Sequence, residues 1–390
     1  MPSAERPRPL DGIRVLDLTR LLPGNFCTLA LALLGADVIK VEDRGAGDYM
    51  RVFGHQVDGA GAAHHLANRD KRSLCLDLKD PADRAVFTDL VRSAHVLVES
   101  FRPGVLDRLG FGAQALHAIR PDLVVASISG YGATGPLAQA AGHDLNYLAF
   151  SGFLHRLGER GGPGVPPPIP LSDLVGGGLL PALLIVAYLR RAEDTGIGAH
   201  IDAAMAEGIA LLPSVLTGDV VAGAPIEGRG HGLIGGGLAC YGVYPAADGE
   251  IVVGALERKF WDTVCDVVGT LDDYRDRHED PTAQDDIRKR LEEFFAPLSR
   301  DEVVARFSGH DACVSPVLSY EEMLASPQAV ARQFLDPNGP LPIPTLAFPA
   351  MVDGRRLSAR RGAPRQGDHS AEVLAELRGQ RRPDKEPDHG

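Results

Sequence analysis

One short segment of this 390-residue sequence carries side chains suited to moving protons. His143 and Asp144 are adjacent, and Tyr147 follows His143 by four positions. On a helix such a spacing puts His143 and Tyr147 on the same face. Histidine has a usual pKa of about 6.5, so near neutrality it can both accept and donate a proton. The structural alternative is a helix start that Asp144 caps while His143 fills space.

Two other carboxylates stand at predicted helix starts. Asp173 precedes an apolar helix, after a loop rich in Pro and Gly at residues 161–170, and Ser172 is an expected N-cap of that helix. Glu257 follows the apolar run at 251–256. Each carboxylate, taken alone, is typical of a helix N-terminus, where the helix dipole stabilises it. Their spacing in the sequence does not show that they meet His143.

Basic residues gather at the expected strand ends and in the loops beside them. They are Lys40, Arg69, Lys71, Arg72 and Arg102. Ligands of doubly wound sheets bind at strand ends, and phosphates need cations and backbone N–H groups. As a set these residues indicate a phosphorylated ligand, whereas each alone is an ordinary surface charge.

The segment GYGATG at residues 130–135 matches the dinucleotide pattern G-x-G-x-x-G. The pattern also requires a helix directly after the glycines and an acidic residue about 20 positions on. Pro136 follows the last glycine, and position 150 is Phe. A tight turn after a strand is therefore favoured over a nicotinamide or flavin site.

The elements that must position these residues alternate between strands and helices. Apolar runs predict strands at 13–18, 38–41, 73–78, 95–100 and 121–130, with a helix over 82–94. This order predicts an α/β fold with a parallel, doubly wound sheet and helices on both faces. Residues 1–227 are the expected first part of this large domain, and 228–324 are a smaller α+β domain. Residues 325–365 return to the large domain, and 366–390 form a short charged tail, partly disordered.

Composition excludes several classes of protein. The net charge of −12 argues against a nucleic-acid binder, and 44% hydrophobic residues are enough for folded cores. The five cysteines have no spacing typical of a zinc site, so no metal is expected. The longest apolar run, 179–189, is shorter than the ~20 residues that cross a bilayer. We expect a cytoplasmic protein that binds neither membrane nor nucleic acid.

In order along the chain, a set of segments resembles the family III CoA-transferase superfamily (CaiB/BaiF type), and within it the α-methylacyl-CoA racemases. These segments include PLDGIRVLDLTRLLPG, LALLGADVIKVE, NRDKRSLCLDLK, ESFRPGVLDRLGFG, AGHDLNYLAFSG, SDLVGGG, GIGAHIDAAMAEG, ADGEIVVGALERKFW and DACVSPVL. The resemblance covers most of residues 9–320. Racemases of this kind carry a histidine in the GHD segment, as His143 does here, whereas the transferases typically lack it.

The resemblance implies a reaction and a role for each candidate. A thioester acidifies its α-carbon, and inversion needs one acid/base group on each face of that carbon. His143 and Asp173 are the expected pair, with a planar enolate between them and backbone N–H groups of the SDLVGGG helix as donors to its oxygen. Glu257 would orient His143, and Asp144 would support the site.

CoA is part of the substrate, so the resemblance implies no separate cofactor. Lys40, Arg72 and Arg102 are the expected partners of its phosphates, and Tyr147 is counted with the CoA-binding residues. Family members are interlocked homodimers with sites at the subunit interface, so Glu257 would serve the other chain.

Two alternatives stay open. One is a CoA-transferase that forms an aspartyl-acyl anhydride on Asp173, and the other is a non-enzymatic acyl-CoA-binding protein. The acyl group is also open.

Overall fold

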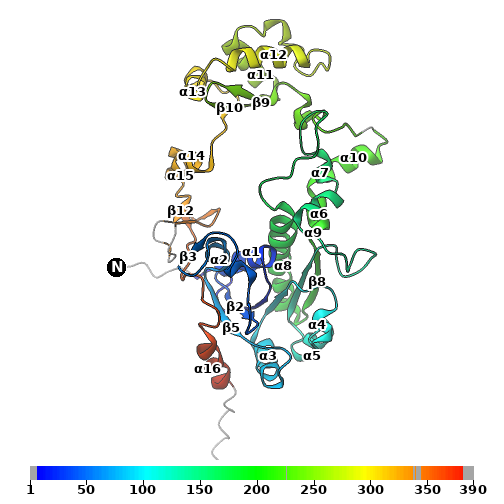
Figure 1. Ribbon diagram of the computed structural model, residues 1–390, viewed down its shortest axis with the longest axis vertical. Coiled ribbons are helices and arrows are strands. Elements are labelled where there is room, and N and C mark those ends of the chain that lie inside the picture. The colour runs from blue at the N-terminus through cyan, green and yellow to red at the C-terminus, as the bar shows by residue number, and fades with distance from the viewer. Residues whose placement is uncertain (1–6, 225, 337–338, 340–343, 381–390) are drawn as a thin grey trace, which may run out of the picture. The chain divides into compact units, whose positions relative to one another are not determined.

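The computed structural model of the chain describes residues 7–224, 226–336, 339 and 344–380 (Figure 1). The chain folds into two compact units. The first contains residues up to 151, 167–212 and from 331 on, and the second contains 152–166 and 213–330. The chain therefore leaves the first unit twice and returns to it twice.

A six-stranded parallel sheet forms the centre of the first unit. Its strands are β1 (Arg14–Leu18), β2 (Asp37–Glu42), β5 (Lys71–Cys75), β6 (Val96–Glu99), β7 (Val124–Ser129) and β8 (Ala199–Ala204). Their spatial order is β5-β2-β1-β6-β7-β8. The predicted α/β class and parallel sheet are confirmed. Strand β5 begins two residues before the expected 73, because charged partners allow Lys71 and Arg72 to lie inside it.

Helices cover both faces of this sheet. On one face, α1 (Leu22–Leu33) and α8 (Leu180–Thr195) pack on side chains such as Val15 and Val96. On the other, α3 (Pro81–Ser93), α5 (Ala113–Ile119) and α16 (Ser370–Gln380) pack on Leu16 and Leu97. Successive strand residues thus point to opposite faces, and both sets are buried because each face has its own helices.

Helix α16 differs from the charged tail expected from residue 366. Its Val373 and Leu377 are buried against the sheet, and its Glu372 and Glu376 form ion pairs with Arg72. These apolar positions are four residues apart, so they share one face of the helix. Residues 381–390 lie outside the described residues.

A π-helical segment, η2 (Ser172–Leu179), runs directly into α8. Its glycines let neighbouring elements come close: a Cβ on Gly176 would lie 2.4 Å from the Met205 carbonyl oxygen, and one on Gly177 would lie 2.6 Å from Pro23 Cβ. Among the described residues, Ser172–Thr195 is the one helix whose length and composition would let it span a bilayer. Burial of Ile185 and Leu189 in the sheet core is typical of a core helix, which passes the same test.

The second unit is built on the antiparallel sheet β11-β10-β9. Its strands are β9 (Tyr241–Ala246), β10 (Gly249–Gly254) and β11 (Val314–Pro316), and Trp261 and Phe295 lie in its core. Its helices are α7 (Phe153–Arg156), α10 (Val215–Val221), α11 (Arg258–Val268), α12 (Gln284–Phe295), α13 (Arg300–Phe307), α14 (Tyr320–Ala325) and α15 (Pro327–Ala331). The longer segment of this unit begins at Pro213 rather than at 228, and the unit also includes residues 152–166.

Short elements complete the described chain. They are β3 (Gln56–Val57), β4 (Ala60–Gly61), α2 (Ala62–Asn68), α4 (Val105–Arg108), α6 (Asp144–Phe150), α9 (Met205–Ala210), β12 (Leu335–Asp336), β13 (Thr345–Leu346), β14 (Met351–Val352) and β15 (Arg355–Arg356), with 3-10 turns at Tyr49–Arg51, Leu212–Ser214 and Asp272–Tyr274 and a π-helical turn at Leu233–Gly237. Of these, α6 and α9 carry residues of the candidate site.

Candidate active site

A cavity of about 410 Å³ opens at the carboxyl ends of β1, β6 and β7. It is lined by Arg20 and Leu21 after β1, by residues 100–103 after β6 and by residues 128–130 at the end of β7. The chain runs from β1 outward to β2 and β5, then returns to place β6 on the other side of β1. Such a reversal of strand order is where doubly wound sheets bind ligands.

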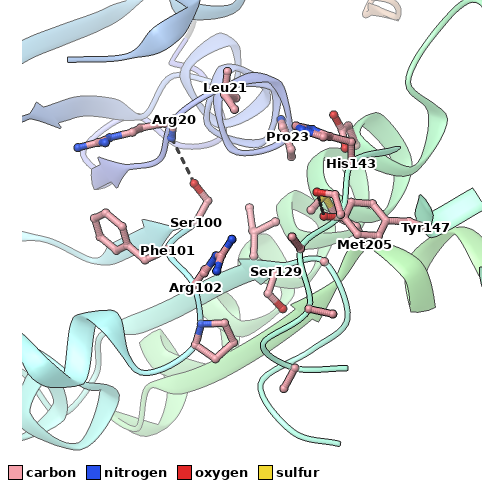
Figure 2. Close-up of a pocket in the computed structure, with 18 residues that line it drawn as sticks. Arg20, Leu21, Pro23, Ser100, Phe101, Arg102, Ser129, His143, Tyr147 and Met205 are labelled. Carbon is pink, nitrogen blue, oxygen red and sulfur yellow. Dashed lines mark hydrogen bonds between the residues drawn. The ribbon is translucent and has the colours of Figure 1, made fainter. Parts of the chain in front are cut away.

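His143 and Asp173 line this same cavity. His143 is exposed and is the N-cap of α6, and its backbone N–H donates to Asn146 Oδ1 at 3.0 Å. In Figure 2, His143 and Tyr147 lie on one side of the cavity, and Arg20 and Ser100 lie on the other. The structure thus brings together the two predicted acid/base residues.

Asp144 connects the two segments that carry these residues. One of its carboxylate oxygens, Oδ1, accepts the backbone N–H of Ser172 at 2.6 Å and that of Asp173 at 3.1 Å. Ser172 is therefore not the expected N-cap, because a carboxylate from α6 takes that position. These two N–H groups are engaged and are not free to bind an enolate oxygen. That another backbone N–H of this segment binds that oxygen stays a prediction. Asp144 instead fixes the backbone of Asp173 relative to that of His143.

The carboxyl group of Asp173 is half-buried and has no hydrogen-bond partner in the described part of the chain. Burial, and then the negative charge of Asp144, raises the pKa of Asp173 from the usual 3.8 to about 7. Both effects disfavour the ionised form. Near neutrality Asp173 is present in both forms, which suits a group that must take a proton in one direction of a reaction and return it in the other.

This pKa has a consequence for stability. A carboxyl that titrates near 7 in the folded chain and near 3.8 in the unfolded chain binds more protons in the folded state between these values, so stability falls as the pH rises from about 4 to about 7. We expect Asp173→Asn to melt above the wild type at pH 8 and at the same temperature near pH 4, measured by differential scanning calorimetry. Equal melting temperatures at pH 8 would contradict the raised pKa.

Tyr147 is buried and packs its ring between two glycines. A Cβ on Gly130 would lie 2.6 Å from Tyr147 Cε1, and one on Gly142 would lie 2.8 Å from the same atom. The Tyr147 hydroxyl donates to the Gly142 carbonyl at 2.7 Å, and burial raises its pKa to about 12. Gly130, the first glycine of GYGATG, is thus explained by the passage of a ring, in agreement with a turn rather than a dinucleotide loop.

Of the three predicted phosphate partners, Arg102 alone lines the cavity, where it is exposed. Its guanidinium has no partner among the residues that the structure describes. The predictions for Lys40 and Arg72 are contradicted. Lys40 is fully buried and forms a 3.0 Å ion pair with Asp48. Arg72 is also buried.

The partners of Arg72 come from β2 and α16. Its guanidinium donates to Asp37 Oδ1 at 2.9 Å and to Glu376 Oε1 at 2.7 Å, and it pairs with Glu372 at 2.9 Å. These carboxylates hold α16 on the sheet. Because its donors are engaged by three carboxylates, Arg72 has a structural role.

Glu257 belongs to the second unit. It is the N-cap of α11, and its side chain is exposed. Its carbonyl accepts the backbone N–H groups of Phe260 and Trp261. That its carboxylate meets His143 stays a prediction.

Several cavity residues were missed by reasoning from the sequence, among them Arg20, Ser100 and Met205. Arg20 lies in the turn after β1, and its backbone N–H donates to Ser100 Oγ at 3.2 Å (Figure 2). The available signal was position, since both residues follow strands that end at the switch in strand order. Nothing in the local sequence around Met205 indicated that it lines the cavity, because it is brought there by β8, which is far along the chain from the other lining segments.

Comparison with known proteins agrees with this geometry. The profile of the CoA-transferase family III matches residues 10–370. The chain is 34% identical to the α-methylacyl-CoA racemase of Homo sapiens, over 94% of this chain and 93% of the relative. It is 35% identical to the acetyl-CoA:oxalate CoA-transferase of Acetobacter aceti, over 95% and 96%. A solved CaiB/BaiF family protein from Brucella suis superposes with a TM-score of 0.85 at 28% identity, covering 95% of this chain and 100% of that one. The chain therefore belongs to the CoA-transferase family III.

Proposed function

We propose that this protein is a 2-methylacyl-CoA racemase, an isomerase that inverts the α-carbon of a branched acyl-CoA thioester. The observation that carries the proposal is that His143 and Asp173 line one cavity and that the pKa of Asp173 lies at about 7. A two-base inversion requires one acid/base group on each face of the α-carbon. Family membership supports an acyl-CoA substrate.

In each direction the proposed reaction removes one proton from the α-carbon and delivers another to its opposite face. In one direction the Asp173 carboxylate removes the α-proton, the electron pair of the C–H bond enters the thioester as an enolate, and protonated His143 delivers a proton to the opposite face. In the other direction neutral His143 removes the proton and protonated Asp173 returns one. The site therefore holds one exchangeable proton in total, on either residue. The Asp144 carboxylate holds the backbone of Asp173 in place relative to that of His143, because it accepts the Ser172 and Asp173 N–H groups.

A CoA-transferase is the second candidate, because relatives of both activities match at similar identity. In that reaction the Asp173 carboxylate attacks the thioester carbonyl, and CoA leaves as thiolate, which gives an aspartyl-acyl anhydride. The thiolate then attacks the aspartyl carbonyl and releases the first acid. The resulting aspartyl-CoA thioester is attacked by the second acid, and the CoA thiolate that leaves takes up the new acyl group from the second anhydride. His143 would have no step in it. The presence of a histidine at position 143 favours the racemase.

The deciding experiment uses one enantiomer of a 2-methylacyl-CoA in deuterated water. Mass spectrometry follows deuterium at the α-carbon, and NMR follows configuration after conversion to a chiral ester. The proposal predicts deuterium incorporation with loss of stereochemical purity. If the α-carbon stays undeuterated while CoA appears on an added carboxylic acid, the protein is a transferase.

The proposal places the CoA moiety beside Arg102, the cavity residue whose guanidinium is unpaired among the described residues. A charge-assisted hydrogen bond to phosphate contributes about 1.5–3 kcal/mol. We expect Arg102→Ala to raise the KM for acyl-CoA by about 10-fold or more and to change kcat little, because this contact is the same in ground and transition state.

Arg92→Ala is the matched control for Arg102→Ala. Arg92 is an exposed arginine of α3, and it pairs with Asp89. Its loss changes the net charge equally without touching the cavity. An equal rise of KM in both variants would mean that overall charge, rather than a contact of Arg102, determines affinity.

The proposal also includes a cytoplasmic homodimer in which Glu257 of one chain orients His143 of the other. Its support is that Glu257 is exposed in a unit separate from that of His143. Co-expression of Asp173→Asn chains with Glu257→Ala chains is expected to restore activity, because each mixed dimer would contain one intact site. Activity no higher than the sum of the separate variants would contradict this arrangement.

A further inference from the structure

One wall of the cavity is a short turn whose backbone is held by buried side chains. The turn follows β1 and consists of Thr19, Arg20 and Leu21, and the last two line the cavity. The Thr19 carbonyl accepts a hydrogen bond from Lys40 Nζ at 2.9 Å. The Leu21 N–H donates to Asp48 Oδ1 at 3.1 Å. Both ends of the turn are thus bound by side chains from outside it.

These two side chains form an ion pair with each other. Lys40 Nζ lies 3.0 Å from Asp48 Oδ2, and both side chains are fully buried. The Asn25 amide bridges the pair, because its oxygen accepts from Lys40 at 2.6 Å and its nitrogen donates to Asp48. Burial lowers the pKa of Lys40, but the negative charges of Asp17 and Asp48 have the larger effect. The pKa of Lys40 therefore lies above its usual value. The pair is therefore charged and bonded on several sides, as a stable buried ion pair must be.

Leu21 needs such support. Its backbone has φ 63° and ψ −167°, a region that is almost restricted to glycine. A non-glycine residue there persists only where its surroundings hold it. Leu21 is also the N-cap of α1, and its side chain is 40% exposed and faces the cavity. The strain is located where a ligand would contact the wall.

We propose that Lys40 and Asp48 are positioning residues of the acyl-CoA site: their ion pair holds the Thr19–Leu21 turn in its strained form and thereby sets the shape of the cavity wall. This gives Lys40 a role that does not require contact with phosphate. The inference rests on the proposed function for its kinetic consequence, but not for its structural one. Without the pair, Leu21 relaxes to an ordinary backbone conformation and the wall moves.

The test compares two equally buried lysines. Lys40→Met removes the ammonium that holds the turn. Lys71→Met removes a neighbouring ammonium whose bonds go to Asp17, Thr28, Asn68 and the Asn25 carbonyl, and not directly to residues 19–21. Its partner Asp17 accepts the Thr19 N–H at 2.9 Å, at the opposite end of the turn from the Leu21 amide. Both variants lose a buried charge, so both should melt below the wild type.

Two readouts separate positioning from general stability. The first is hydrogen exchange of the Leu21 amide, which reports local opening. We expect Lys40→Met to speed it by about 10-fold or more relative to the amides of β2, and Lys71→Met to leave it unchanged. The second is the steady-state kinetics of α-deuterium exchange. Here Lys40→Met should raise KM for the thioester by about 10-fold, and Lys71→Met should keep KM within about two-fold.

If Lys40→Met does not fold, Asp48→Asn takes its place, because asparagine keeps an acceptor for the Leu21 N–H but loses the ion pair. Asp48→Asn should also speed exchange of the Leu21 amide and raise KM, but by smaller factors than Lys40→Met. Unchanged protection of Leu21 in both variants would overturn the proposal, and so would equal changes in Lys71→Met. If wild-type protein shows no α-exchange, the proposed function fails, while amide exchange still decides whether the pair holds the turn.

Discussion

Asp173→Asn is expected to lose stereochemical inversion by about 10²- to 10⁴-fold while keeping its fold, the range typical of a general acid/base group. Asparagine has nearly the same shape and leaves intact the backbone N–H of residue 173, which binds Asp144. What it lacks is a group that takes and returns a proton near pH 7, the pKa of this carboxyl. The rate of inversion, followed by NMR of the recovered acyl group, measures the loss.

A finer outcome follows from having one base on each face. In Asp173→Asn, His143 can still remove the α-proton of the enantiomer that presents it, exchange that proton with solvent and return deuterium to the same face. We therefore expect residual deuterium incorporation without inversion from one enantiomer and none from the other. Asp194→Asn is the control, because Asp194 is an exposed carboxylate at the other end of the same continuous helix. Equal loss in that variant would show that Asp173 acts through charge or stability alone.

His143→Gln is expected to lose inversion to a similar extent, about 10²- to 10⁴-fold. Glutamine retains hydrogen-bonding capacity but has no pKa near neutrality. Residual exchange without inversion should now come from the opposite enantiomer, because Asp173 is the remaining base. The two variants together would then assign each residue to one face of the α-carbon.

The same variant separates the two candidate functions. If Asp173 is the nucleophile of a CoA-transferase, His143→Gln should retain transfer of CoA between carboxylic acids, whereas Asp173→Asn should abolish it. His155→Gln is the matched control, since His155 is an exposed histidine of α7. Retained inversion in His143→Gln would exclude the two-base mechanism.

The sheet could be predicted from the sequence because its signals are local. Strands buried on both faces are commonly apolar runs of four to eight residues, and Val96–Glu99 and Val124–Ser129 follow that pattern. Predictions from the sequence were wrong where contacts between residues far apart in the chain determine the structure. Val373 and Leu377 look like part of a charged tail until the sheet that buries them is known.

The site was predicted in part for the same reason. His143 and Asp173 carry chemistry in their residue types, and the resemblance paired them. Lys40 and Arg72 were misassigned because their environment, rather than their type, determines what they do. Arg72 pairs with Glu376, which is 304 positions away, and Asp48 reaches Lys40 through a fold that local sequence does not show. A lysine inside an apolar strand, as in VIKVE, is a signal for a buried, paired charge rather than for a ligand contact.

The position of α16 has a consequence for the order in which the protein can fold during synthesis. This helix covers one face of a sheet whose strands all lie within the first 204 residues. Those strands leave the ribosome well before residues 370–380, and until then the sheet face around Leu74 and Leu97 lacks this helix. Contacts between residues so far apart in sequence form slowly, and exposed apolar surface in the interval favours aggregation. Yield of soluble protein should therefore depend on chaperones that bind nascent apolar surfaces, more than the stability of the finished fold would suggest.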